Sequence, residues 1–158
     1  MMIRIAIAIT ALLAGPVTAA TKPAAVKPVL SLQGAYRFTS TAMDTVTKQP
    51  VCTETWTFAL GNLTVESGEE RVEQRFRMIK DRTGNWLVTA SLSTNGKPDC
   101  TGHASATVSP EESRIYLLPM NGGNFLTCPP PGRTAKGIPF ISDCFGSLRR
   151  IAPESTAR

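Results

Sequence analysis

Residues 51–80 read VCTETWTFALGNLTVESGEERVEQRFRMIK, and the spacing of apolar side chains in this stretch decides the fold. Trp56 and Phe58 share one face of its first segment, and Phe76 and Met78 share one face of its last. Apolar residues at every second position are typical of half-buried β-strands, whereas helices repeat every three or four. Two short turns containing glycine separate the segments, so the stretch predicts consecutive β-hairpins.

The same pattern of short alternating segments and turn residues extends in both directions from this stretch. It predicts an all-β domain over residues 29–151, folded as an antiparallel meander that closes into an eight- or nine-stranded barrel. Closure would remove the exposed sheet edges, and a β-sandwich is the alternative. The predicted strands are residues 34–40, 51–60, 63–67, 71–80, 85–93, 100–109, 114–118, 125–128 and 145–151.

Aromatic side chains in the predicted strands are expected on the inner faces of the barrel. An eight-stranded barrel is just wide enough to be filled by such side chains or to hold one small ligand. A packed core is favoured, because no polar group is evidently placed to orient a ligand. The set comprises Tyr36, Phe38, Trp56, Phe58, Phe76 and Trp86.

The beginning of the chain is typical of a secretory signal peptide. Arg4 precedes an apolar run at residues 5–15, and Pro16 and small residues follow up to Ala20. The run is too short to cross a bilayer, which takes about 20 apolar residues. We therefore expect residues 1–20 to be removed on export to the periplasm or the medium, without stable membrane insertion afterwards. A flexible leader at residues 21–28 and a disordered tail at residues 152–158 are also predicted from composition.

Four cysteines follow the predicted cleavage site, and an even number in an exported chain indicates disulfide bonds. Their wide spacing argues against a zinc site, which uses close pairs. Sequence alone leaves three pairings open. We predict Cys128–Cys144, which closes a short loop rich in proline, and Cys52–Cys100, which joins the beginnings of two predicted strands.

Gly34-Ala35-Tyr36, which opens the first predicted strand after the leader, resembles the G-x-W start of lipocalin-like barrels, with Tyr36 in place of tryptophan. Exported bacterial barrels of this kind include small-ligand carriers and the Inh-type metalloprotease inhibitors. The resemblance implies a lipocalin-like architecture. No functional residue is transferred, and the cysteine spacing departs from that of the inhibitor family.

No pattern in the sequence indicates catalysis, a metal or a cofactor. His103 is predicted to be an ordinary surface residue, because Ser105 beside it lacks a nucleophile-elbow motif. Glu54 shares a face with Trp56 and is either a buried acid with a raised pKa or a solvated residue near a strand end. We expect a non-catalytic protein, with an enzyme of unrecognised type as a minor alternative.

The basic composition does not by itself select a partner. The formal net charge is +5, and removal of Arg4 with the signal peptide would leave +4, which also serves solubility. Arg71, Arg75 and Arg77 lie on one face of a predicted strand. Glu73 interrupts them, and no aromatic side chain lies beside them for base stacking, so nucleic acid is not expected as a partner.

The segment from Asn121 to Gly137, within the long loop from Pro119 to Pro139, is the predicted binding region. A loop this rich in glycine and proline adds little to the core, but a disulfide and polyproline geometry would hold it rigid for binding. We expect it to contact an envelope protein or an anionic glycan, as an inhibitor or accessory factor would. The alternative is a lipocalin-like carrier of a small apolar ligand. The candidate contact residues are Asn121, Asn124, Arg133 and Lys136.

Overall fold

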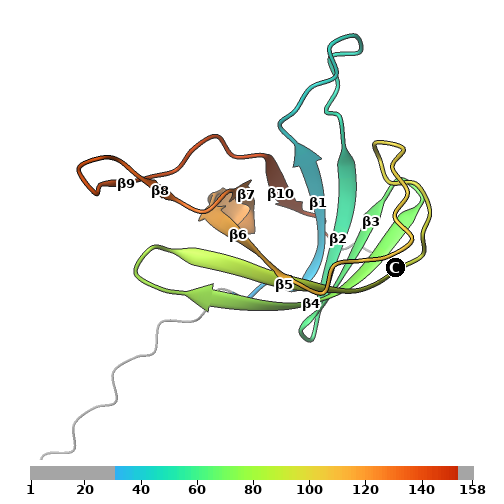
Figure 1. Ribbon diagram of the computed structural model, residues 1–158, viewed down its shortest axis with the longest axis horizontal. Coiled ribbons are helices and arrows are strands. Elements are labelled where there is room, and N and C mark those ends of the chain that lie inside the picture. Colours follow the sequence, from blue (N-terminus) through green and yellow to red (C-terminus); the bar gives the residue numbers. More distant parts are fainter. Residues whose placement is uncertain (1–30, 153–158) are drawn as a thin grey trace, which may run out of the picture.

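The protein is an all-β domain, as predicted (Figure 1). The computed structural model describes residues 31–152, so the predicted signal peptide and leader, and all but the first residue of the predicted tail, lie outside the described residues. The strands are β1 (Gly34–Ser40), β2 (Thr53–Ala59), β3 (Asn62–Ser67), β4 (Glu70–Lys80), β5 (Asn85–Thr94), β6 (Glu112–Pro119), β7 (Phe125–Cys128), β8 (Gly132–Arg133), β9 (Pro139–Phe140) and β10 (Gly146–Arg150), with a short 3-10 turn, η1 (Asn121–Gly123).

Eight of these strands form a closed barrel in the order β1-β10-β7-β6-β5-β4-β3-β2, and every neighbouring pair is antiparallel. The prediction of a closed barrel is therefore confirmed, and the β-sandwich alternative is not observed. β8 and β9 form a separate two-stranded hairpin that projects from the barrel wall (Figure 1). The two-residue turn between β2 and β3 uses Leu60 and Gly61, both at positive φ, which suits the twist of a tight hairpin.

Aromatic side chains from neighbouring strands pack together inside the barrel. Phe38 stacks on Trp56 with ring centroids 5.3 Å apart, and Tyr36 meets Phe58 edge-on at 5.6 Å. Offset and edge-to-face pairs of this kind add to the free energy gained by burying the rings. Leucines close the remaining space, and the inward-facing set includes Leu32, Leu63, Leu87, Leu117 and Leu148.

Trp86 does not face the core, so the expectation for this residue was wrong. Its neighbour Leu87 is fully buried in the core, and Trp86 packs edge-on against Tyr116 on the outer side of the barrel wall, with ring centroids 5.3 Å apart. Both faces of β5 have apolar side chains, so alternation alone did not distinguish inside from outside. The outer face is apolar here because it lies next to the β8–β9 hairpin.

Two segments differ from their predicted secondary structure. Residues 100–109 form no strand and belong to a loop, residues 95–111, between β5 and β6; we call it the mouth loop. The Asp99 carboxylate accepts hydrogen bonds from the backbone N–H groups of Thr101 and His103, both at 2.8 Å, which competes with strand pairing. The second difference is the β8–β9 hairpin, which lies within the segment predicted to be a loop.

Both predicted disulfides are present. Cys52–Cys100 ties the start of β2 to the mouth loop, and Cys128–Cys144 ties the end of β7 to the segment preceding β10. The second bond therefore closes the base of the excursion that contains the β8–β9 hairpin. Each bond fixes one long connection to the barrel, and disulfides of this kind persist in oxidising compartments.

Candidate binding sites

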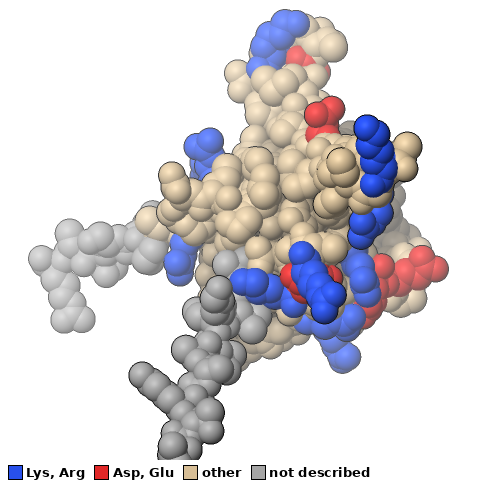
Figure 2. Space-filling view, turned by 90° about the vertical axis from the view of Figure 1, so that its left-hand side faces the viewer, with Lys and Arg blue, Asp and Glu red and all other residues tan. Residues whose placement is uncertain are grey.

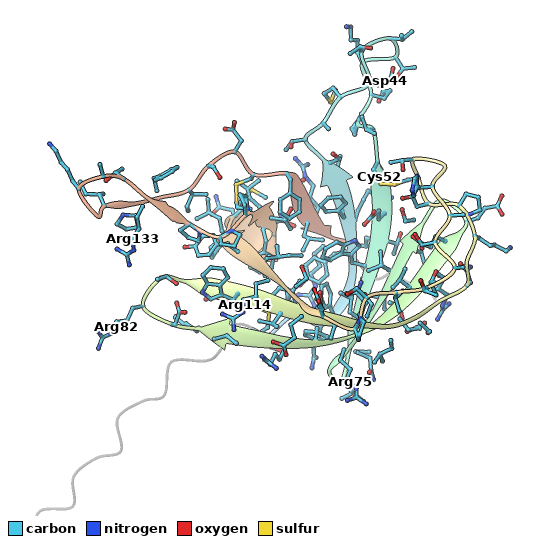
Figure 3. All side chains as sticks on the ribbon, in the orientation of Figure 1. Asp44, Cys52, Arg75, Arg82, Arg114 and Arg133 are labelled. Carbon is cyan, nitrogen blue, oxygen red and sulfur yellow. A yellow bond between two sulfur atoms is a disulfide. The ribbon has the colours of Figure 1, made fainter. Side chains whose placement is uncertain are left out.

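A groove lies between the β8–β9 hairpin and the turn from β4 to β5. Its volume is about 490 Å³, within the range of ligand pockets. Figure 3 shows Arg133 on the hairpin and Arg82 at the tip of the facing turn, on opposite sides of this space. The lining residues are Arg82, Thr83, Tyr116, Pro131, Arg133, Pro139, Phe140 and Ile141.

The floor of this groove is rigidly attached to the barrel. The Tyr116 hydroxyl donates a hydrogen bond to the Thr83 carbonyl oxygen at 2.9 Å, and the Trp86 indole N–H donates to the Thr83 hydroxyl at 3.1 Å. Gly84 leaves room for Tyr116, because a Cβ at residue 84 would overlap the phenol group. Thus the β4–β5 turn and β6 are locked together beneath the hairpin.

The hairpin is held by its own short-range contacts. Arg133 Nη1 donates a hydrogen bond to the Gly137 carbonyl oxygen at 2.9 Å, and the Thr134 N–H donates to the Ile138 carbonyl oxygen at the same distance. The Phe140 ring covers Gly132, where a Cβ would be only 2.8 Å from the ring. With Cys128–Cys144 at its base, the hairpin is a constrained element.

The structure separates the four predicted contact residues. Arg133 lines the groove, whereas Lys136 lies exposed in the hairpin turn and does not line it. Asn121 and Asn124 lie before β7, and the hairpin follows the end of that strand. Asn124 donates to the Asn121 carbonyl oxygen at 2.8 Å and accepts from the Arg150 N–H at 2.9 Å, so its side chain joins η1 to the end of β10.

Figure 2 looks onto the side of the molecule from which the hairpin projects. Lys and Arg side chains gather on the lower part of this face, beside isolated acidic side chains. Two of the basic side chains on β4 are partly neutralised by acidic neighbours, as the sequence suggested. Arg71 pairs with Glu66 at 3.6 Å and Glu73 at 2.9 Å, and Arg77 pairs with Glu112 at 2.8 Å. Exposed pairs of this type contribute little to stability.

A second candidate site lies inside the barrel, at the end covered by the mouth loop. The cavity there has a volume of about 320 Å³. It adjoins a space of about 470 Å³ beneath the far half of the mouth loop, and the two share Glu70, Val72, Gln74, Ser91 and Ser113. The remaining residues around the inner cavity are Glu54, Trp56, Val65, Ser67, Thr89, Asp99 and Ile115.

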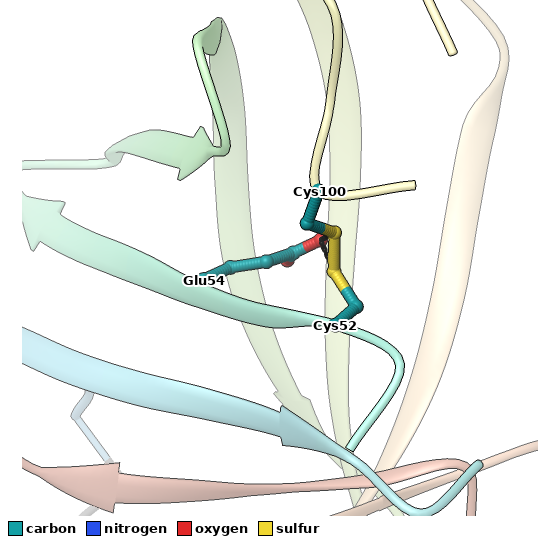
Figure 4. Close-up of side chains that lie close together, drawn as sticks. All are labelled: Cys52, Glu54 and Cys100. Carbon is teal, nitrogen blue, oxygen red and sulfur yellow. Dashed lines mark hydrogen bonds between the residues drawn. A yellow bond between two sulfur atoms is a disulfide. The ribbon is translucent and has the colours of Figure 1, made fainter. Parts of the chain in front are cut away.

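Glu54 is a partly buried acidic side chain of this cavity. Its Oε2 atom accepts a hydrogen bond of 2.6 Å from the Trp56 indole N–H, and its Oε1 atom lies 3.3 Å from the Cys52 sulfur (Figure 4). Burial raises the pKa of Glu54 above its ordinary value; hydrogen bonds from Trp56 and Ser67 lower it in part, and the charges of Asp99 and Glu70 raise it further. Of the two environments considered for Glu54, the structure shows the partly buried one.

The carboxylate of Glu54 and the sulfurs of Cys52 and Cys100 form the one cluster with metal-ligand spacing among residues 31–152. The two sulfurs are bonded to each other (Figure 4), so neither is a thiolate able to ligate an ion. The arrangement is a carboxylate against a disulfide, and it does not fit a metal.

Ser67 and Cys100 fasten the mouth loop over the cavity. The Cys100 N–H donates to the Ser67 hydroxyl oxygen at 3.2 Å, and that hydroxyl lies 3.0 Å from the Cys100 sulfur. The Glu69 N–H donates to the Pro98 carbonyl oxygen at 3.0 Å. His103, on the outer part of the same loop, is exposed, as predicted.

Comparison of the chain with protein-family models, curated proteins and solved structures found no match. The functional argument therefore starts from the two sites themselves. The sequence indicated Arg133 in one site and Glu54 in the other. It did not indicate that Arg82, Tyr116 and Phe140 would surround Arg133.

Proposed function

We propose that the protein is a non-catalytic binding protein of the cell envelope that grips a protein partner in the groove beneath the β8–β9 hairpin. The observation on which this depends is the composition of the groove, where Arg82 and Arg133 flank an apolar lining formed by Tyr116, Phe140 and prolines. Arginine and aromatic side chains are the residues that most often dominate binding energy at protein interfaces.

Exposed apolar side chains on the hairpin favour a protein over an anionic glycan. Phe140 is 48% exposed, Ile138 is 58% exposed and Ile141 is 38% exposed, all within four residues of the chain. An apolar side chain of a partner would bury them, while its carboxylates would pair with the two arginines. Because the hairpin is constrained before binding, little conformational entropy is lost when the complex forms.

A periplasmic or secreted location is supported by the predicted signal peptide and by the disulfides. Two disulfides in a domain of this size indicate an oxidising environment. No helix within residues 31–152 is long and apolar enough to cross a membrane. A partner in the envelope or outside the cell is the one that such a protein would meet.

Capture from envelope extract by the immobilised mature protein tests this proposal. The bound protein is identified by mass spectrometry, purified and titrated against groove variants. We expect Arg82→Ala and Arg133→Ala together, and Phe140→Ala alone, each to weaken binding by about tenfold or more, which is the range of interface hot spots. Arg75→Ala and Lys136→Ala are the controls, since each removes an exposed positive charge outside the groove.

Melting temperatures of all the variants show whether a loss of binding reflects unfolding. Undiminished binding by both the double arginine variant and Phe140→Ala would contradict the proposal, as would equal losses in the control variants. Capture of an anionic glycan in place of a protein, lost with Arg82 and Arg133 but not with Phe140, would replace the assigned class of partner.

The alternative function, transport of a small apolar ligand, has weaker support. Much of the barrel interior is filled by its own aromatic and leucine side chains. A cavity of about 310 Å³ beside the β2–β3 turn is lined in part by Leu32, Phe76 and Met78, and the cavity at the mouth-loop end is lined largely by carboxylates, hydroxyls and an amide. Such a lining would leave polar groups desolvated against an apolar ligand.

A further inference from the structure

The charged residues that line the two adjoining cavities at the mouth-loop end are all acidic. Glu54, Glu70 and Asp99 line the inner cavity, and Glu111 and Glu112 line the outer one together with Glu70; no lysine, arginine or histidine lines either. Among residues 31–152, Glu112 is the one member of this set that forms an ion pair with a lysine or arginine, Arg77 on the outer wall. Because Glu111 and Glu112 are exposed, the acidic side chains of the inner cavity are Glu54, Glu70 and Asp99, in a chain whose formal net charge is +5.

A second observation is the side chain of Thr89, which lines the same inner cavity. The residue is 94% buried, as its exposed fraction is 6%, and no hydrogen bond joins its side chain to another residue within residues 31–152. Its hydroxyl oxygen is not fully enclosed, unlike that of Thr127, so it is accessible from the cavity. A hydroxyl in this position can donate a hydrogen bond to a molecule in the cavity or accept one from it.

Apolar side chains lie among these polar groups. Trp56 stacks on Phe38 and is fixed by its hydrogen bond to Glu54, and Val65, Val72 and Ile115 complete that part of the lining. Pockets that bind small molecules typically combine an apolar lining with a few placed polar groups. The Trp56 ring is also the side chain whose face attracts cations most strongly.

We propose that this cavity is a second binding site, specific for a small organic cation: an amine with a compact apolar body. The ammonium group pairs with the Glu54 carboxylate and donates to the Thr89 hydroxyl, while the apolar body packs against Trp56 and the adjoining aliphatic side chains. The mouth loop, bonded to β2 through Cys52–Cys100, covers the bound ligand. This site is separate from the hairpin groove and does not depend on its function.

Three probes that share one aromatic ring test the charge preference: benzylamine, benzyl alcohol and benzoate, which are cationic, neutral and anionic at pH 7. Binding is followed by the proton–nitrogen NMR signal of the Trp56 indole. The Trp86 indole is an internal control, because it donates to Thr83 on the outside of the barrel. Trp86→Phe assigns the two signals. We expect benzylamine alone to shift the Trp56 signal saturably, at least tenfold more tightly than benzyl alcohol, with benzoate without effect.

Substitutions then separate Glu54 from general surface charge. Glu54→Gln keeps an acceptor for Trp56 and should weaken benzylamine binding about tenfold, which is about 1.4 kcal/mol. Glu66→Gln removes the same charge on the outer face, where Glu66 pairs with Arg71, and should change nothing. Thr89→Val retains the shape of the side chain and should weaken binding several-fold.

Circular dichroism confirms that each variant is folded, and Thr89→Val provides the test if Glu54→Gln does not fold. Equal affinity for benzylamine and benzyl alcohol would overturn the proposal, and so would the absence of any shift of the Trp56 signal at millimolar benzylamine. Equal losses in Glu54→Gln and Glu66→Gln would reduce the effect to net charge and would also overturn it.

Discussion

At the scale of single residues, Glu54 has an environment that makes protein stability depend on pH. Burial raises its pKa, so the folded protein binds this proton more tightly than the unfolded chain, in which the pKa returns to about 4.5. The cost of keeping Glu54 ionised is present at neutral pH. It disappears as the pH falls through the folded-state pKa towards that of the unfolded chain, and no further gain occurs below it.

We therefore predict that wild-type protein gains stability relative to Glu54→Gln as the pH falls from 7 to about 4.5. Other carboxylates titrate in the opposite sense: hydrogen bonds from Thr47, Thr83 and Thr101 lower the pKa values of Asp44, Asp81 and Asp99. The difference between the two proteins removes these shared contributions. Thermal melts of both at matched pH values measure it, and a difference that stays constant with pH would contradict the assigned environment of Glu54.

At the scale of elements, the mouth loop depends on a glycine in the turn between β3 and β4. Gly68 has a φ of +59°, and a Cβ there would lie 2.7 Å from the backbone carbonyl carbon of Asp99. Backbone atoms cannot move aside singly, so Gly68→Ala must displace the loop next to Cys100. Gly102 lies in the same loop at a φ of +81°, but a Cβ there has open space around it.

Both substitutions place a Cβ on a left-handed backbone, so both have a similar conformational cost, and only Gly68→Ala adds a steric clash. We predict that Gly68→Ala lowers the free energy of unfolding by about 1–3 kcal/mol more than Gly102→Ala, the usual cost of overpacking. Urea denaturation measures this difference. Amide exchange should accelerate at Glu69 and Cys100 in Gly68→Ala alone, and equal effects of both substitutions would show that the loop does not rest on this turn.

At the scale of the whole molecule, the barrel was predictable because the inner faces of most strands alternate strictly and glycine-containing turns separate them. Trp86 was placed on the wrong face because Trp86, Leu87 and Val88 are all apolar. With apolar side chains on both faces of the strand, the sequence does not show which face points into the barrel. Strands of two residues, such as β8 and β9, are shorter than any recognisable pattern. They form because the disulfide at their base and the Phe140 ring over Gly132 bring the two segments together.

The candidate sites were less predictable than the barrel. Arg133 was named from its loop, but Arg82 and Tyr116, distant in sequence, join it only because β4, β5 and β6 pair in their observed register. Likewise, Glu54 is close to Thr89 only after the barrel closes. In the sequence, each polar residue on an inner face can be interpreted as lying near the end of a strand. Only the three-dimensional structure shows how many of them line the same cavity.

Each disulfide fastens the connection that forms one of the two sites, which leads to a prediction for the molecule as a whole. The chain-entropy estimate assigns about 3 kcal/mol to a bond closing a loop the size of Cys128–Cys144 and about 4 kcal/mol to one the size of Cys52–Cys100. We therefore expect the double variant C52S/C100S to unfold at a lower urea concentration than C128S/C144S, with the barrel of each variant still folded at 25 °C.

The two variants should also differ in binding. C128S/C144S should lose capture of the groove partner while still binding benzylamine, because the benzylamine site lies at the mouth loop. C52S/C100S should show the opposite pattern. Urea titrations and the two binding measurements on the same preparations test this, and loss of both activities in either folded variant would show that the sites are coupled through the barrel rather than independent.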